Sequence, residues 1–183
     1  GRAMATRRGR ATSQDATVRV VIYCRISLDP RKKEEGVDRQ RKDGLAMAAG
    51  RGWEVVGIFI DNDISALTGA HRPEYERMMA AVRTGRATRI IAYGLSRVWR
   101  NRRERVGAIE ELKTIRGFDG VTLIKGGEID LSSAMGRSYA AIMGEYDTME
   151  SELKGERVAA AAQDRAARGK AHGHVAYGWQ REY

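Results

Sequence analysis

The chain has 183 residues, of which 42% are hydrophobic, so it can bury a core and wholesale disorder is excluded. Its 33 lysines and arginines outnumber 24 acidic residues, and the net charge of +9 favours a polyanionic partner, nucleic acid before an acidic membrane surface. No apolar run reaches the roughly 18–20 residues of a membrane-spanning helix, and the start lacks the pattern of a signal peptide, so no membrane partner is expected.

The first two segments differ sharply in composition. Residues 1–17 contain four arginines and no apolar periodicity, which predicts a flexible basic arm. Residues 18–24 are almost entirely apolar and predict a buried strand. The single cysteine, Cys24, lies in this run; we interpret it as a small buried hydrophobe in a cytoplasmic protein, and it excludes a disulfide framework or a multi-cysteine zinc site.

Strands and helices are then predicted to alternate. Strands are expected over 53–60, 88–93 and 121–125, and helices over 38–50, from Pro73 to Gly85 and from about Val106 to Gly117. The residues expected to face inward are Leu45, Ala48 and Ala49 in the first helix, Tyr75, Met78, Met79 and Val82 in the second, and Val106, Ile109, Leu112 and Ile115 in the third. The alternation predicts an α/β sandwich around a mainly parallel sheet, with its working site beyond the carboxyl ends of the strands.

The last element is a long helix predicted over 136–169. Its apolar residues recur at alternating steps of three and four, which indicates a coiled-coil-like seam; they are Tyr139, Ile142, Tyr146, Met149 and Leu153. A helix of this length spans about 50 Å at roughly 1.5 Å per residue, which is too long for so small a domain to cover. We expect pairing with a second subunit, and the alternative is a partly frayed helix packed on its own sheet. The later part has an alanine-rich basic surface suited to a DNA backbone, with Arg157, Arg165, Arg168 and Lys170.

Arginine is concentrated between residues 83 and 105, where eight arginines accompany one acid, Glu104. Guanidinium groups match phosphate oxygens bidentately and stay charged at any workable pH. Arg97 and Arg100 flank an apolar pair directly after a buried strand, which favours a functional role over a solvated surface. For Arg102, Arg103 and Arg105 both a DNA contact and a solvated helix face stay open.

A hydroxyl and a carboxylate lie at the same predicted strand ends. Arg25 and Ser27 alternate on one side after the first strand, and Asp61 follows the second. A serine beside several arginines suits nucleophilic attack on a phosphodiester, because the arginines neutralise the charge that grows in the transition state. Asp61 would orient groups or relay a proton.

Five motifs in order resemble the serine recombinases, the resolvase/invertase family. They are YCRIS at 23–27, GVDRQR at 36–41, FIDNDISA at 59–66, HRPEYERMM at 71–79 and LSRVWRNRRER at 95–105, and 130–152 resembles the end of the catalytic fold with its long helix. The resemblance implies a resolvase-like three-layer sandwich followed by a long C-terminal helix. The longer loop between Ser27 and Gln40 points to the large serine integrases of phages and mobile elements.

The resemblance assigns roles by position. Ser27 matches the nucleophile that forms a 5′-phosphoserine bond and releases a 3′ hydroxyl. The residues that match the phosphate-binding pocket are Arg25, Arg72, Arg97, Arg100, Gln40 and Asp61, with Ser65 a further candidate. Many relatives carry Asp where this chain has Ser96, which puts the proton donor to the leaving group in doubt.

The family also implies partners and a domain plan. Its members bind double-stranded DNA sites as dimers, form tetramers at synapsis, cleave both strands of each site, rotate subunits and rejoin the ends without a metal or cofactor. We expect an arm at 1–17, a catalytic domain at 18–135, the long helix at 136–169 and, at 170–183, a linker into an absent recombinase domain. The chain is therefore expected to be a catalytic-domain fragment, with Arg102 and Arg103 among its DNA contacts.

Three other readings have less support. A metal-dependent nuclease needs clustered carboxylates, and 61–63 is the only tight acidic group outside the predicted helices. A catalytically silent DNA-binding module has Ser96 as its only hint and does not explain Ser27 together with four matching arginines. A small-ligand binder of flavodoxin type predicts a glycine-rich or hydroxyl-rich phosphate loop, which the segment after the first strand does not resemble. His71, His172 and His174 are interpreted as ordinary polar residues.

Overall fold

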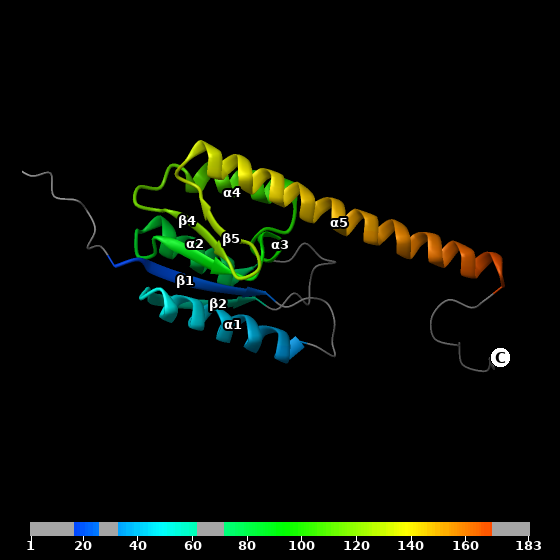
Figure 1. Ribbon diagram of the computed structural model, residues 1–183, viewed down its shortest axis with the longest axis horizontal. Coiled ribbons are helices and arrows are strands. Elements are labelled where there is room, and N and C mark those ends of the chain that lie inside the picture. Colours follow the sequence, from blue (N-terminus) through cyan, green and yellow to red (C-terminus); the bar gives the residue numbers. More distant parts are fainter. Residues whose placement is uncertain (1–16, 26–32, 62–71, 170–183) are drawn as a thin grey trace, which may run out of the picture.

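The computed structural model describes residues 17–25, 33–61 and 72–169 of the chain and is built on one five-stranded sheet. The strands are β1 (Arg19–Arg25), β2 (Glu54–Asp61), β3 (Arg89–Ala92), β4 (Gly120–Leu123) and β5 (Gly127–Asp130). They lie in the order β2-β1-β3-β4-β5; the first four are parallel, and β5 is antiparallel to β4 (Figure 1). The predicted fold class, a mainly parallel α/β sheet with a long final helix, is confirmed.

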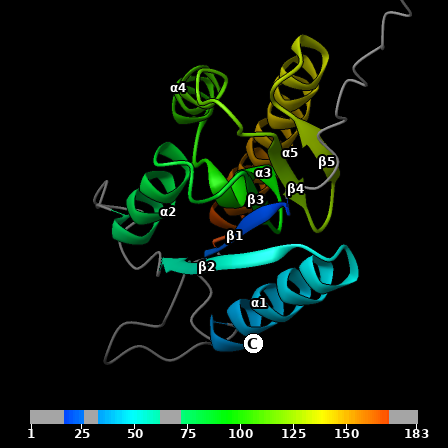
Figure 2. The same cartoon turned by 90° about the vertical axis from the view of Figure 1, so that its left-hand side faces the viewer.

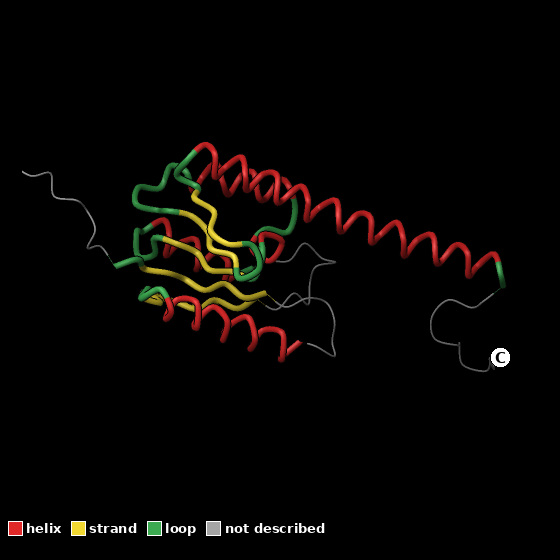
Figure 3. The backbone as a smooth tube through the Cα atoms, viewed as in Figure 1, coloured by secondary structure: helices red, strands yellow, loops and turns green. Residues whose placement is uncertain are grey.

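Helices cover both faces of this sheet. They are α1 (Lys33–Gly50), α2 (Pro73–Arg83), α3 (Leu95–Val98), α4 (Arg102–Leu112) and α5 (Ala134–Ala167). Figure 2, which views the sheet from its end, shows α1 on one face and α2 and α4 on the other. The layers are therefore helix, sheet, helix, and the tube in Figure 3 shows α5 continuing well beyond them.

The central strand β1 supplies side chains to two hydrophobic cores. Val21 and Tyr23 pack with α2, α4 and the start of α5, whereas Val20, Ile22 and Cys24 pack under α1. A strand that is buried on both faces has no polar side, which is why residues 18–24 form an almost unbroken apolar run.

Helix α1 begins earlier and faces the sheet differently from the prediction. It starts at Lys33, not Asp38. Ala48 is buried as expected, but Leu45 is 36% exposed and Ala49 is exposed. Helix α1 approaches β1 tightly at Gly44, where an added Cβ would lie 2.9 Å from the Ile22 side chain. A small residue there lets the helix axis come close to β1, and this rotates Leu45 toward solvent.

Helix α4 is also rotated from the predicted orientation. Its buried positions are Arg105, Ala108, Ile109 and Leu112, which follow helical spacing from residue 105. Val106, predicted to face inward, is 53% exposed. Arg105 takes the inward place because a carboxylate and a glycine of α5 accommodate its guanidinium.

Strand β5 and the short helix α3 were not predicted. The hairpin between β4 and β5 turns at 124–126, and Gly127 has a φ of 77°, a left-handed conformation that favours glycine. The Gly126-Gly127 pair, which separates the mainly apolar run 121–124 from Ile129, was the available signal for a hairpin.

Helix α5 is the predicted long helix, with 34 residues. Ser133 caps it by accepting a hydrogen bond from the Gly136 amide at 3.0 Å. Only Ala140 and Gly144 among its residues are buried, because the helix packs on β5, α4 and α3 with its first half and then projects beyond the sheet (Figure 1). No helix in the described part of the chain is long and apolar enough to cross a membrane.

Candidate functional site

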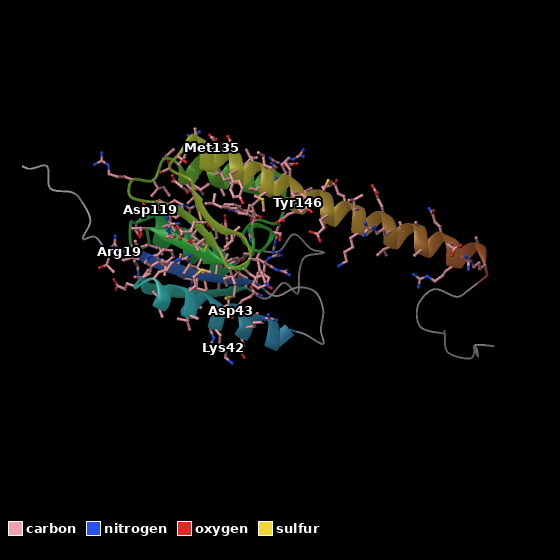
Figure 4. All side chains as sticks on the ribbon, in the orientation of Figure 1. Arg19, Lys42, Asp43, Asp119, Met135 and Tyr146 are labelled. Carbon is pink, nitrogen blue, oxygen red and sulfur yellow. The ribbon has the colours of Figure 1, made fainter. Side chains whose placement is uncertain are left out.

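Polar side chains gather at the carboxyl ends of β1, β2 and β3. Arg25 ends β1 directly opposite Asp61, which ends β2, and the loop after β3 forms α3 beside them. Figure 4 orients this edge: Arg19 and Asp119 are at the other end of the sheet, and Tyr146 is on the side where α5 leaves the domain. In a parallel sheet this edge is where ligands usually bind.

Arg25 is held through both its backbone and its side chain. The Gln40 carboxamide accepts from the Arg25 amide at 3.3 Å and donates to the Arg25 carbonyl at 3.2 Å, as a neighbouring strand would. The Arg25 guanidinium donates to the Ser96 carbonyl at 2.6 Å and to the Arg97 carbonyl at 3.2 Å. Gln40 therefore acts on the backbone of Arg25, and Arg25 ties β1 to the loop that carries Arg97.

Arg72 is the most buried cation of the site, with its side chain 5% exposed. Its Nη1 donates to the Val98 carbonyl at 2.8 Å and to the Tyr23 hydroxyl at 3.4 Å. Its guanidinium lies 4.0 Å from the centre of the Tyr75 ring, a cation–π contact. Its Nη2 forms an ion pair with the Glu104 carboxylate, whose side chain is 27% exposed.

Asp61 uses its carboxylate to organise the start of α2. It accepts from the Glu74 amide at 3.2 Å, from the Tyr75 amide at 2.9 Å and from the Tyr23 hydroxyl at 2.9 Å. Those two amides belong to the first turn of α2, where helix donors lack intrahelical acceptors. Of the two roles predicted for Asp61, the described geometry supports orientation.

The segment from Leu95 to Asn101, which consists of α3 and the loop after it, carries Arg97 and Arg100, and both are partly buried. The Arg100 amide donates to Glu104 Oε2 at 2.6 Å, and Asn101 caps α4 by accepting from the Glu104 amide at 2.9 Å. Trp99 is buried and donates its indole N–H to the Tyr75 hydroxyl at 3.2 Å. Glu104 thus joins the Arg100 backbone to Arg72.

Helix α5 contacts the same loop. Asp147 accepts a hydrogen bond from the Ser96 amide at 3.3 Å. Close by, Glu145 pairs with Arg105 at 2.5 Å and accepts from Arg102 Nε at 2.8 Å. These arginines lower the pKa of Glu145, with the hydrogen bond from Arg102 the largest cause. Glu145 therefore holds α5 against α4, and Asp147 holds it against the segment that carries Arg97.

The predicted residues are distributed as follows. Arg25, Gln40, Asp61, Arg72, Arg97 and Arg100 come together at one edge of the sheet, whereas Ser27, Ser65 and Lys170 lie outside the described residues. Arg105, for which a DNA contact or a solvated face was left open, has neither environment: its side chain is 6% exposed and pairs with Glu145. Arg102 and Arg103 are exposed on α4, Arg157 and Arg165 are exposed on the second half of α5, and Arg168 is exposed directly after its end.

The seam predicted on α5 is exposed along its length. Tyr139, Ile142, Tyr146, Met149 and Leu153 are between 40% and 67% exposed. Exposed apolar patches of this kind on a small protein mark interaction surfaces. Within the described residues no group of three or more His, Cys, Asp or Glu side chains is arranged to hold a metal ion.

Three site residues escaped the sequence analysis: Tyr23, Glu104 and Asp147. Burial is the largest cause that raises the pKa of the Tyr23 hydroxyl, so it stays protonated between Asp61 and Arg72. Tyr23 lies in the motif YCRIS at 23–27, but no role was predicted for its side chain. Glu104 was noted only as the single acid among eight arginines. Asp147 had no sequence signal, because α5 reaches the loop only through the tertiary fold.

Comparison with known proteins gives a consistent result. The family model "Resolvase, N terminal domain" matches residues 20–171. The fold is similar to a resolvase family site-specific recombinase from Streptococcus pneumoniae, with 19% identity, a TM-score of 0.57 and coverage of 81% of this chain and 99% of that one. It is also similar to the N-terminal catalytic domain of TP901-1 integrase, with 25% identity, a TM-score of 0.55 and coverage of 74% and 98%. No curated protein sequence matches the chain.

Proposed function

The chain belongs to the resolvase family of site-specific DNA recombinases, and we propose that it is the catalytic domain of an integrase from a phage or another mobile element, with Ser27 as its nucleophile. The observation that carries the proposal is the connected network at the strand ends. It ties the backbone just before Ser27 to a buried Arg72 and to the loop of Arg97 and Arg100. An edge with so many guanidinium groups suits a substrate with anionic oxygens.

The proposed reaction is a transesterification. The Ser27 oxygen attacks the scissile phosphorus, the bond from phosphorus to the 3′ oxygen breaks, and the DNA is left with a free 3′ hydroxyl and a 5′-phosphoserine link to the protein. The serine proton must leave and the 3′ oxygen must gain one. One phosphoester replaces another, so no nucleotide is consumed, and the reverse reaction with a new 3′ hydroxyl rejoins the strands. We propose that the chemistry uses no metal or cofactor.

The proposed role of the arginines is to stabilise the negative charge that develops in this reaction. We assign Arg25, Arg72, Arg97 and Arg100 to the non-bridging oxygens, whose negative charge grows as the fifth bond to phosphorus forms. Gln40 is a positioning residue, because both polar atoms of its carboxamide bond to the Arg25 backbone.

The exposed seam of α5 supports an assembly of identical subunits on DNA. Apolar residues along the first half would pair with a second copy of the helix, giving a dimer on each site and a tetramer when two sites meet. The exposed arginines farther along α5 would follow the phosphates of double-stranded DNA. The projection of α5 beyond the sheet makes both contacts geometrically possible (Figure 1).

The decisive experiment looks for the covalent intermediate. The chain is incubated with a duplex carrying its crossover site, nicked close to the scissile phosphate so that the short released strand diffuses away and cannot rejoin. We expect a protein–DNA adduct that resists denaturant and maps by mass spectrometry to Ser27. Ser27→Ala should fold normally and form no adduct, while Ser138→Ala, an exposed serine on α5, should form it normally. Protein trapped on cleaved DNA by Ser27→Ala would refute the assignment.

A second comparison tests the arginines. Removing one preorganised electrostatic group typically costs about 3–4 kcal/mol of transition-state stabilisation, or roughly 10²–10³ in rate. Arg97→Ala should slow adduct formation to this extent. The matched control is Arg116→Ala, which removes an exposed arginine just after α4 and should leave the rate unchanged. Cleavage by Arg97→Ala at a near-normal rate would remove Arg97 from the pocket.

A further inference from the structure

The Glu104 carboxylate occupies donors that a phosphate oxygen would use. One oxygen, Oε1, pairs with Arg72 Nη2, and the other, Oε2, accepts from the Arg100 amide at 2.6 Å. The carboxylate therefore spans the Arg72 guanidinium, which the proposed function assigns to the scissile phosphate, and the backbone amide of Arg100, a residue with the same assignment. Two oxygens on one carbon and two non-bridging oxygens on one phosphorus present similar forks to such donors.

The hydrogen-bond capacity of Arg72 limits where a phosphate can bind. Both hydrogens of Nη1 have acceptors, the Val98 carbonyl at 2.8 Å and the Tyr23 hydroxyl at 3.4 Å. One face of the guanidinium is against the Tyr75 ring. A bidentate contact needs two adjacent N–H groups, so with Nη1 engaged it has to include Nη2, which faces Glu104.

The two partners differ in their freedom to move. The Arg72 side chain is 5% exposed and has partners from β1 and from the loop after β3, whereas the Glu104 side chain is 27% exposed on the first turn of α4. Rotation of Glu104 toward water leaves a guanidinium fixed in place with its outer donor open. Rotation of Arg72 would break its contacts within the core.

We propose that Glu104 is an internal anion of this site, which holds the Arg72 guanidinium and the Arg100 amide until a phosphate group displaces it. The inference rests on the proposed function only for the identity of the natural ligand, a DNA phosphodiester. Without DNA the carboxylate neutralises a buried cation, which otherwise destabilises a fold. With DNA, the repulsion between carboxylate and phosphate favours exchange. The carboxylate thereby competes with free anions and weakens their binding, whereas a phosphate held in place by a docked duplex displaces it readily.

Inorganic phosphate is a sufficient probe, and the experiment needs no DNA. Glu104→Gln keeps an oxygen that can accept from the Arg100 amide but removes the negative charge. A ligand that binds the folded state raises the unfolding midpoint. We expect phosphate to raise the melting temperature of Glu104→Gln saturably, with an apparent affinity at least ten-fold tighter than that of the wild type, when sodium chloride keeps the ionic strength constant.

Glu111 provides the matched control on the same helix. It pairs with Arg83 at 2.5 Å, outside the site, so Glu111→Gln also removes a carboxylate from an arginine. Glu111→Gln should respond to phosphate as the wild type does. Equal phosphate responses of Glu104→Gln and Glu111→Gln would overturn the proposal.

A measurement on the wild type decides the matter if Glu104→Gln does not fold. The carboxyl carbon of Glu104 and the amide of Arg100 should shift together in NMR spectra as phosphate is added, with saturation, and chloride should not reproduce the change. Shifts of the Arg100 amide without the Glu104 carboxyl mean that the carboxylate stays in place, which refutes displacement. Ser27→Ala should behave as the wild type in this measurement. The absence of a serine adduct would therefore count against the proposed function, whereas the absence of phosphate exchange would count against the role of Glu104.

Discussion

Gly144 of α5 lies against the Arg105 side chain of α4, and replacing it with alanine tests how the long helix is held. A Cβ at Gly144 would lie 2.2 Å from Arg105 Nε and 2.3 Å from its Cζ. Ordinary contact begins near 3.4 Å, so the guanidinium has to move by about 1.2 Å, the difference between the two distances. The Arg105 side chain is 6% exposed and pairs with Glu145, so it moves only by leaving that partner or by pushing α5 away from α4.

Two opposite effects set the size of the change. Alanine in place of glycine inside a helix stabilises by about 1 kcal/mol. Overpacking of a tight contact destabilises by about 1–3 kcal/mol, and the buried guanidinium also loses its pairing geometry. We expect a net loss of about 1–2 kcal/mol for Gly144→Ala, which lowers the melting temperature of a domain of this size by about 2–8 °C.

Gly107 supplies the control for this substitution. It lies exposed in α4, and an added Cβ would have no heavy atom within 4 Å, so Gly107→Ala should stabilise by about 1 kcal/mol. Urea unfolding followed by circular dichroism gives both values. In an Arg105→Ala background the change at Gly144 should lose its penalty. If Gly144→Ala stabilises as Gly107→Ala does, or destabilises equally without the arginine, the proposed contact is wrong.

Three further perturbations test other parts of the molecule. Asp61→Asn keeps one acceptor oxygen for three donors and should lower the free energy of unfolding by about 1–2 kcal/mol in urea titrations; an unchanged midpoint would show that the carboxylate does not organise α2. Burial raises the pKa of the Cys24 thiol to about 11 from its ordinary 9.0, so iodoacetamide should not label the native protein at pH 8. Because the folded-state pKa is the higher one, the stabilising effect is present below about pH 9 and is lost as the pH rises toward 11; full native labelling at pH 8 contradicts this burial. Ile142→Glu should shift the chain toward monomer in sedimentation velocity, whereas Val106→Glu, also an exposed apolar residue, should not; equal effects would remove α5 as the interface.

The sequence predicted most of the fold because its signals were local. The apolar run at 18–24, Pro73 at a helix start and the inward spacing from Tyr75 to Val82 each follow from burial or backbone geometry within one element. The errors arose where a second element decides which face is inward. Leu45 and Val106 have the spacing of core residues, but Gly44 and Arg105 are the positions at which the neighbouring elements come close.

The site was predicted in part for the same reason. Strand ends of a parallel sheet converge, so Arg25, Asp61 and the loop of Arg97 could be placed together from the sequence. The carboxylates that hold these residues in place could not be predicted from the sequence. Glu104 faces Arg72 only because α4 turns back toward α2, and Asp147 reaches the loop only because α5 crosses it.

The backbone of Ser96 connects the packing of α5 with the arginine site. Its amide donates to Asp147 on α5 at 3.3 Å, and its carbonyl accepts from the Arg25 guanidinium at 2.6 Å. Asp147 is less than one helical turn from Gly144, where α5 presses on Arg105. A displacement of α5 of about 1.2 Å would stretch the bond from the Ser96 amide beyond hydrogen-bond range. The Ser96 amide and carbonyl belong to the two peptide planes that meet at the Ser96 Cα, so a shift of the backbone at this residue would also displace the carbonyl that accepts from Arg25. The packing of α5 and the placement of Arg25 are therefore coupled. We expect Gly144→Ala to change the NMR signal of the Arg25 side chain as well as the free energy of unfolding.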